Sequence, residues 1–127
     1  MGSNPTPAAM KFATQSNYRH NFAAPAPVVE SSFLLDTDGN PVGGHTVGPG
    51  FDIDWQNGVV TSPDAINGAN VIDILEVVRQ RLEFFNTTKF KCRENSIAIT
   101  KIEEAIHWLD ARIQDRKVRN VLSTMEP

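Results

Sequence analysis

The sequence predicts an α+β fold, in which a small antiparallel β-sheet precedes a C-terminal hairpin of two helices. Short apolar segments separated by glycine, proline and aspartate turns fill the first half, and two amphipathic helical stripes fill the second. The 127 residues suit one domain. We place it at residues 21–127, β-rich over 21–67 and helical over 68–127, and we expect residues 1–20 to form a flexible tail because they lack an apolar period.

The β half contains two segments that predict strands. Residues 32–35 are a short apolar run that enters a turn at Asp38-Gly39. Residues 51–56 alternate apolar and polar side chains, so Phe51, Ile53 and Trp55 should share one half-buried face. The glycine-rich stretch 42–50 predicts either a loop or a bulged strand, and residues 59–67 a connecting loop.

The helical half carries two stripes with the spacing of amphipathic helices. The first predicts a helix over about 70–85, which either Asn67 or Asn70 can cap. The second predicts a helix over about 93–119, roughly 40 Å long at ~1.5 Å per residue. The shorter helix covers only part of the longer one, so the remaining apolar surface favours association with a second copy. The apolar positions are Val71, Ile74, Leu75, Val78, Leu82 and Phe85, then Ile99, Ile102, Ile106, Leu109 and Ile113.

Composition and charge exclude several classes of protein. The single cysteine excludes an internal disulfide framework and multi-thiolate metal sites. The sequence has no apolar run long enough for a membrane span, and no apolar segment follows its first residues as in a secretory signal. We therefore expect neither feature, and we expect a cytoplasmic protein. Residues 1–78 carry a net charge of −6 and residues 79–127 carry +3. That distribution argues against binding to DNA and favours a small anion near the C-terminal half.

The strongest candidate site residues are arginines near the end of the second helix. Arg112, Arg116 and Arg119 are spaced by four and three residues, so they follow one edge of the helix and are suited to bind phosphate oxygens. The alternative is a solvated helix end in which Asp110 and Asp115 pair with them. Near the helix junction, Phe85 and Asn95 are suited to stack on a purine and to contact its edge, or they simply pack the hairpin and cap a helix.

No residue pattern predicts catalysis, a metal or a cofactor. Cys92 lies at a helix start beside two cations, which allows a reactive thiolate, although a packed structural cysteine is the simpler interpretation. Glu104 and His107 have the spacing of half a dimetal site, but no second such pair exists. The carboxylate pairs Asp36/Asp38 and Asp52/Asp54 both fit structural roles in a turn or strand.

Residues 90–112 resemble the phage Thoeris anti-defence sponge family, which shares this helix with the anti-CBASS cyclic-nucleotide sponges. The stretch begins Phe90-Lys91-Cys92-Arg93-Glu94-Asn95 and contains Ile102-Glu103-Glu104-Ala105, and Arg116 and Arg119 continue the pattern. Gly48-Pro49-Gly50-Phe51 and Trp55-Gln56-Asn57-Gly58 are similar to the family's sheet. The resemblance covers residues 45–124.

The resemblance implies a non-enzymatic sponge. Members of the family bind cyclic ADP-ribose-type signals of bacterial immunity in the host cytoplasm and keep them from their effector, in pockets between protomers of dimers that also assemble into hexamers. It implies that Phe85 stacks on the adenine, that Asn95 contacts the base, and that Arg112 and Arg116 hold phosphates or ribose. Arg119 and Thr124 belong to the tail that closes the family's pocket.

The tail departs from the family pattern, which usually reads Arg-Gly-Val-Glu-Gly-Thr. Here it reads Arg119-Asn120-Val121-Leu122-Ser123-Thr124, and Ile113 replaces a common threonine. Both glycines and the glutamate are replaced, so the tail conformation and the choice of ligand stay open.

Two alternative functions follow from these observations. One is a sponge for cyclic di- or trinucleotides of CBASS immunity, bound at a separate site near Arg93 and Lys91. The other is a protein-interaction module that uses the exposed apolar face of the second helix.

Overall fold

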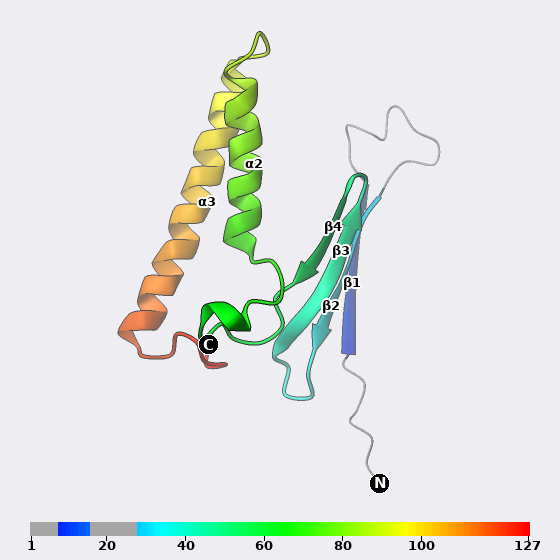
Figure 1. Cartoon of the computed structure of the whole chain (residues 1–127), viewed down its shortest axis with the longest axis vertical. Helices are drawn as coiled ribbons and strands as arrows, with labels where there is room; N and C mark the ends of the chain where they lie inside the picture. Colours follow the sequence, from blue (N-terminus) through cyan, green and yellow to red (C-terminus); the bar gives the residue numbers. More distant parts are fainter. Residues whose placement is uncertain (1–7, 16–27) are drawn as a thin grey trace. The chain divides into compact units, whose positions relative to one another are not determined.

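A computed structural model describes residues 8–15 and 28–127 (Figure 1). The described strands are β1 (Ala8–Gln15), β2 (Val28–Leu35), β3 (Pro41–Gly48) and β4 (Phe51–Trp55). A short 3-10 helix, η1 (Pro63–Ala65), precedes the helices α2 (Val71–Phe85) and α3 (Arg93–Val118). The predicted α+β fold with a C-terminal helical hairpin is therefore confirmed.

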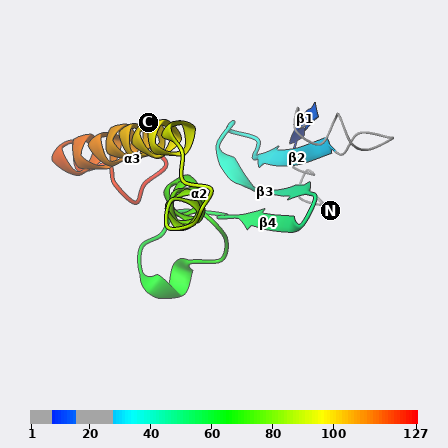
Figure 2. The same cartoon turned by 90° about the horizontal axis from the view of Figure 1, so that it is seen from above.

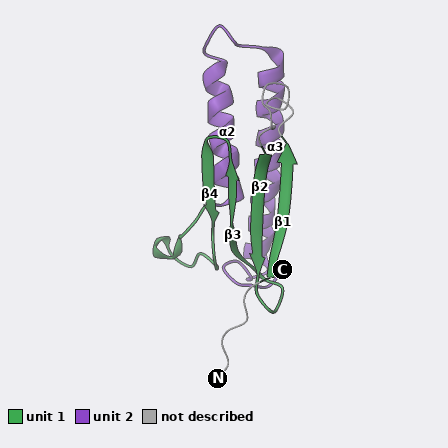
Figure 3. Cartoon of the chain, turned by 90° about the vertical axis from the view of Figure 1, so that its right-hand side faces the viewer, with its two compact units in different colours: residues 1–69 green, residues 70–127 purple. Residues whose placement is uncertain are grey.

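Contacts divide the chain into two compact units, residues 1–69 and residues 70–127 (Figure 3). The boundary lies within two residues of the expected change from β-rich to helical sequence. None of the described helices is long and apolar enough to cross a membrane.

The first unit is a sheet in which the strands follow chain order, and each pairs antiparallel with the next (Figure 2). It differs from the sequence prediction in two places. Residues 8–15 form β1 instead of belonging to a tail, and the remainder of residues 1–20 lies outside the described part of the chain. The second strand begins at Val28 rather than at residue 32. Of the two alternatives for the glycine-rich stretch, the strand is confirmed as β3, and its pairing with β2 contains a register shift between Phe33 and Leu35.

Glycine is required in β3 because the backbone of β2 comes very close. A Cβ atom at Gly44 would lie 2.4 Å from the carbonyl oxygen of Ser32, and the residue has a φ of +138°. A side chain here would clash with β2, so glycine makes this pairing possible instead of preventing it.

The turn between β2 and β3 is built around the side chain of Asp36. Its Oδ1 accepts hydrogen bonds from the backbone N–H groups of Asp38 and Asn40, both at 2.9 Å. Gly39 takes the positive φ that the turn needs. These hydrogen bonds, led by the one from Asn40, lower the pKa of Asp36.

Aromatic rings of three strands pack on one face of the sheet. The rings of Phe12 and Phe33 lie 5.5 Å apart, and those of Phe33 and Trp55 lie 6.3 Å apart. The buried Thr46 accepts a 2.7 Å hydrogen bond from Trp55 Nε1 and shares one of 2.7 Å with Ser31 Oγ. The predicted strand at residues 51–56 is confirmed as β4, in which Ile53 and Trp55 are half-buried. Phe51, expected on the same half-buried face, is instead 41% exposed.

Two side chains hold the loop that follows β4. Gln56 donates from Nε2 to the Ala65 carbonyl at 2.9 Å and accepts from the Asn67 N–H at 3.0 Å. Asn67 in turn accepts from the Asn57 N–H at 2.8 Å. Asn67 thus stabilises the loop and does not cap the next helix.

The second unit is an antiparallel hairpin in which α2 packs against α3, and the two helices lie farther apart toward the end of α3 (Figure 1). Asn70 caps α2 by accepting a 2.9 Å hydrogen bond from the Asp73 N–H. The apolar side chains of α3 that were expected to form its packed face are half-buried or, for Ile99, buried. Other large apolar side chains stay open to solvent, notably Trp108 at 72% and Phe84 at 52% exposure.

Candidate functional site

The three predicted arginines lie together at the C-terminal end of α3. Arg112 and Arg116 lie within the last two turns of the helix, and Arg119 is its C-cap residue. Arg119 Nε donates to Asp115 Oδ2 at 3.0 Å, so one predicted acidic partner is engaged. The sequence prediction that these side chains share a ridge agrees with their common contacts, described next.

The arginines bind backbone oxygens of the segment that follows α3, which we call the strap and define as residues 120–127. Arg116 donates from Nη2 to the oxygens of Val121 and Thr124 at 3.0 and 3.1 Å, and from Nη1 to those of Glu126 and Pro127. Arg112 and Arg119 both donate to the Pro127 oxygen, at 3.3 and 3.0 Å. The strap therefore folds back over the arginines.

A left-handed turn directs the strap toward the arginines. The Val121 N–H donates to the Arg116 carbonyl at 3.0 Å and the Asn120 N–H to the Lys117 carbonyl at 3.1 Å, the pattern of a Schellman motif. Asn120 and Ser123 have φ values of 60° and 64°, the only positive values among the described non-glycine residues. These two positions carry glycine in the family pattern, so the substituted tail retains a backbone conformation that glycine favours.

Thr124, another predicted ligand-binding residue, stabilises a turn within the strap. Its hydroxyl donates to the Val121 carbonyl and accepts from the Glu126 N–H at 3.2 Å. The Thr124 hydroxyl is thus engaged within the strap in this conformation.

A groove of about 540 Å³ lies beside the arginines, within the second unit. It is lined by the start of α2 on one side and the end of α3 on the other, with Leu122 of the strap completing the wall. The two arginines and the partial positive charge at the start of α2 bring positive charge to this groove, and Asp73 brings a carboxylate. Its lining residues are Asn70, Val71, Ile72, Asp73, Leu109, Arg112, Ile113, Arg116 and Leu122.

Phe85 and Asn95, the predicted base-binding residues, lie at the hairpin tip. Phe85 is half-buried, and its ring lies 5.9 Å from that of the exposed Phe84. The Arg81 guanidinium lies over both rings, 5.2 Å from the centre of Phe84 and 4.9 Å from that of Phe85. Asn95 Nδ2 donates to the Phe90 carbonyl at 3.3 Å. The tip combines an aromatic surface with a cation and an amide.

The tip and the arginine end are far apart within one chain. Asn95 lies in the first turn of α3, and Arg112 and Arg116 follow 17 and 21 residues later on the same helix. At ~1.5 Å per residue they are roughly 26–32 Å from Asn95 along the axis. One protomer therefore does not bring the predicted base-binding and phosphate-binding residues together.

The residues predicted for a second nucleotide site are only partly clustered. Arg93 lines a hollow of about 320 Å³ together with Lys101, Thr100, Ser96 and Ile97. Lys91 is exposed in the preceding loop and is not among the residues that line the hollow. Lys101, which pairs with Glu104 at 3.5 Å, is the second cation there.

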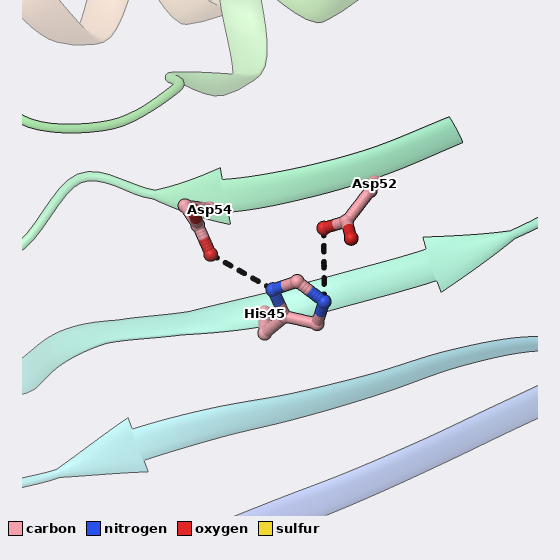
Figure 4. Close-up of side chains that lie close together, drawn as sticks. All are labelled: His45, Asp52 and Asp54. Atoms are coloured by element: carbon pink, nitrogen blue, oxygen red, sulfur yellow. Dashed lines mark hydrogen bonds and ion pairs between the residues drawn. The ribbon is translucent and has the colours of Figure 1, made fainter.

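A histidine cluster that the sequence analysis did not assemble lies on the sheet (Figure 4). His45 of β3 contacts two carboxylates of β4: Nδ1 lies 2.8 Å from Asp54 Oδ1, and Nε2 lies 2.9 Å from Asp52 Oδ1. Because each ring nitrogen faces a carboxylate, the doubly protonated imidazolium fits best. The hydrogen bond with Asp54, followed by the charge of Asp52, raises the pKa of His45.

This cluster is the one group of metal-ligating side chains found among the described residues. Its ligand atoms lie within 4.8 Å of one another, but the carboxylates approach opposite nitrogens of the ring. A shared ion would need a different side-chain arrangement. His45 and Asp54 are partners in the register of β3 and β4. That register would have revealed the cluster, but it can be predicted only once β3 is recognised as a strand.

Comparison with known proteins places the chain in a family. Residues 49–114 match the family profile described as "Acb2/Tad1, hairpin domain". The chain belongs to the Acb2/Tad1 hairpin-domain family. It is also 43% identical over 74 residues to Thoeris anti-defense 1 of Bacillus phage SBSphiJ7, an alignment that covers 58% of this chain and 51% of the phage protein. The chain thus matches about half the length of that relative.

The hairpin-domain match contains only part of the candidate site. It includes the tip residues Phe85 and Asn95, and also Arg112. It ends before Arg116 and the strap. The contacts between the arginines and the strap are consequently features of this chain that the family match does not describe.

Cys92, Glu104 and His107, which the sequence analysis considered for reactivity or metal binding, take part in helix capping or ring packing or lie exposed on α3. Cys92 is half-buried at the N-cap position of α3, where its N–H donates to Asn86 Oδ1 at 3.4 Å. Glu104 and His107 are exposed on α3, and the His107 ring packs edge-on against Trp108 at 5.9 Å.

Proposed function

We propose that this hairpin-domain protein binds a cyclic ADP-ribose-type signalling nucleotide and sequesters it without cleaving it, as a phage defence against bacterial Thoeris immunity. The observation that carries the proposal is the groove between the start of α2 and Arg112 and Arg116 of α3. Family membership and similarity to a protein named Thoeris anti-defense 1 support the biological setting.

The groove has the chemistry of a phosphate site. Cyclic ADP-ribose carries a diphosphate, and guanidinium groups bind such oxygens through paired, charge-assisted hydrogen bonds. The start of α2 adds partial positive charge. Asp73 also lines the groove, but its carboxylate accepts a 2.7 Å hydrogen bond from Asn70, which engages one of its oxygens.

The hairpin tip has the chemistry of a base site. Phe85 supplies an aromatic face for the adenine, and Asn95 supplies an amide that can read the purine edge. Arg81 lies over the rings of Phe84 and Phe85, and it places a cation beside the base.

We propose that two copies of the chain complete each site. If two hairpins lie antiparallel, the tip of one meets the arginine end of the other, and a twofold axis creates two equivalent pockets. The exposed Trp108 and Phe84 supply apolar surface for such an interface. Three dimers assembled in the same way give the hexamer that the family resemblance implies.

The expected affinity suits sequestration. A base stack contributes ~1–3 kcal/mol, and each charge-assisted hydrogen bond contributes ~1.5–3 kcal/mol. A stack with four such bonds approaches the ~12 kcal/mol of a nanomolar complex. Tight binding without turnover is all that a sponge requires.

Calorimetry with cyclic ADP-ribose tests the function directly. We expect tight binding, and intact nucleotide should be recovered after the protein is denatured by heat. Recovery of a hydrolysed product would instead identify an enzyme. Light scattering should give a dimer or a multiple of it, whereas a monomer would leave the helical face free and favour the protein-interaction module.

The hollow at Arg93 favours a second ligand class. Arg93 and Lys101 place two cations beside the polar Ser96 and Thr100, which suits a cyclic di- or trinucleotide. We extend the proposed second site from Arg93 and Lys91 to include Lys101. Cyclic dinucleotide and cyclic ADP-ribose should then bind additively, and Lys101→Ala should weaken only the cyclic dinucleotide.

A further inference from the structure

We propose that the outer edge of β1 pairs antiparallel with β1 of a second copy of the chain, so that two sheets join across a twofold axis at Phe12. This surface lies in the first unit, outside the residues that match the family profile. It requires neither a nucleotide nor the hairpin interface proposed above, so it is independent of the proposed function.

The edge of the sheet formed by β4 is protected against pairing. This strand has five residues, and two of them are aspartates. Its end is also covered, because the Ala69 N–H donates to the Asp54 carbonyl at 2.8 Å and the Ala69 carbonyl accepts from the Gln56 N–H at 3.0 Å. Short length, charged side chains and a covering segment are the usual protection of a sheet edge.

The opposite edge, formed by β1, lacks these protections (Figure 2). The strand has eight residues, all exposed, with no proline and with Lys11 as its single charge. Every second residue of an antiparallel strand directs its N–H and C=O away from the strand beside it. Among the described residues, no backbone hydrogen bond reaches these outward groups of β1. Met10 and Phe12 add exposed apolar side chains, at 50% and 54%, and such an edge favours pairing with another strand.

The geometry of antiparallel pairing limits the registers that two copies of β1 can adopt. Opposed residues direct their backbone groups to the same side, so their numbers must be both even or both odd. The twofold axis then passes through a single residue. An axis at Lys11 pairs residues 8–14 and an axis at Phe12 pairs residues 9–15, whereas any other axis leaves more of the strand unpaired.

Charge and ring packing favour the axis at Phe12. An axis at Lys11 places two ammonium groups directly opposite each other, which destabilises a strand pair. An axis at Phe12 instead opposes two phenyl rings, and aromatic cross-strand pairs stabilise sheets. Each lysine then lies opposite Ala13 of the other copy.

This register also matches the faces of the two sheets. Phe12, Phe33 and Trp55 already pack in a row on one face of each sheet. Because opposed side chains lie on the same face, the two rows meet at the axis and form one aromatic surface. On that face, Met10 of one copy lies opposite Thr14 of the other.

A methyl NOE between Met10 and Thr14 tests the pairing in wild-type protein without nucleotide. Within one strand these residues are four positions apart, about 14 Å at ~3.4 Å per residue, which is too far for an NOE. We expect the NOE in protein labelled at methionine and threonine methyl groups. Phe12→Leu should keep it, and Phe12→Lys should abolish it by opposing two charges at the axis. Absence of the NOE in wild type, or its persistence in Phe12→Lys, would overturn the inference.

Disulfide cross-linking tests the register. Single cysteines replace Lys11, Phe12 or Ala13 in a Cys92→Ser background, where serine suits the N-cap position of α3. Opposed Cβ atoms lie ~4.5–5.5 Å apart and diagonal ones ~7–8 Å apart, and a disulfide needs ~3.5–4.5 Å. Phe12→Cys should therefore form linked dimers about tenfold faster than Lys11→Cys or Ala13→Cys under mild oxidation.

The control for cross-linking is Asp64→Cys, at an exposed position of η1 outside the strands. It should link no faster than random collision. Fastest linking of Lys11→Cys would place the axis at the wrong residue, and equal rates for all four cysteines would show that the β1 edges do not pair. Either result overturns the inference. A dimer held together only by the helical hairpins would give neither the NOE nor selective linking of Phe12→Cys, so the proposed sponge would stand while this inference failed.

Discussion

A complementation experiment tests whether each nucleotide site is shared between two copies. The perturbations are Phe85→Leu, which removes the stacking ring but keeps an apolar side chain, and Arg112→Ala, which removes one guanidinium from the groove. These residues belong to opposite ends of the hairpin, Phe85 at the last position of α2 and Arg112 near the end of α3. Each variant alone should carry a defect in every site.

The magnitudes follow from the contacts that each change removes. Loss of the stack costs ~1–3 kcal/mol, and loss of one charge-assisted hydrogen bond costs ~1.5–3 kcal/mol. Both changes should weaken binding about 5- to 150-fold. Lys117→Ala removes a positive charge from the same end of α3 without lining the groove, so it should bind almost as wild type does.

The mixed protein gives the decisive result. In a dimer that contains one copy of each variant, one site combines the intact Phe85 of one copy with the intact Arg112 of the other. Random mixing makes about half of the dimers mixed, so about a quarter of all sites recover wild-type affinity. Co-refolded variants titrated by calorimetry should show this tight fraction. A mixture that binds only weakly would refute the shared site.

Three further predictions concern the sheet and the start of α2. An NMR titration should give His45 a pKa above its ordinary value of 6.5, and Asp54→Asn should lower the pKa of His45. Because the pKa of His45 is raised in the folded protein, its interaction with the two carboxylates stabilises the fold fully below pH 6.5. That stabilisation is lost as the pH rises through the raised pKa. Thr46→Val should lower the free energy of unfolding in urea by ~1–3 kcal/mol, because Trp55 Nε1 loses its hydrogen-bond acceptor. Thr46→Ser keeps a hydroxyl and should lower the free energy of unfolding by less. An unchanged urea midpoint for Thr46→Val would contradict the role of this hydrogen bond. Asn70→Ala should cost ~1 kcal/mol by removing the cap of α2, Asn70→Asp should retain most of the stability, and equal losses for the two would exclude capping.

The helical hairpin was predictable from sequence because its signals are local. Apolar spacing located α2 and α3 to within a residue at each end, and Asn70 was one of two proposed caps. The strand β4 was equally visible, since Ile53 and Trp55 alternate with aspartates. Each of these patterns depends on neighbours within a few residues in the chain.

The other strands depend on partners that a local pattern does not reveal. β1 contains Met10 and Phe12 at alternating positions, but both are half-exposed, and the strand depends on its pairing with β2. β3 appears too rich in glycine to be regular, yet Gly44 is what allows β2 to approach. The His45 cluster became apparent only when the register of β3 and β4 was known.

The candidate site was predictable in its residue types but not in its arrangement. The spacing of Arg112, Arg116 and Arg119 predicted a common ridge. It did not predict that backbone oxygens of the strap would bind them, because backbone oxygens are present in every sequence. Helix length shows that Phe85 and Arg112 lie at opposite ends of one hairpin.

The scarcity of buried side chains has a thermodynamic consequence. Among the described residues, only Ile99 and Thr46 fall in the buried class, and no side chain is completely enclosed. A chain that removes so little apolar surface from water by itself should be stabilised by the association of two copies that we propose above. Its melting temperature should then rise with protein concentration, and a shared site would form more slowly when the chain is dilute.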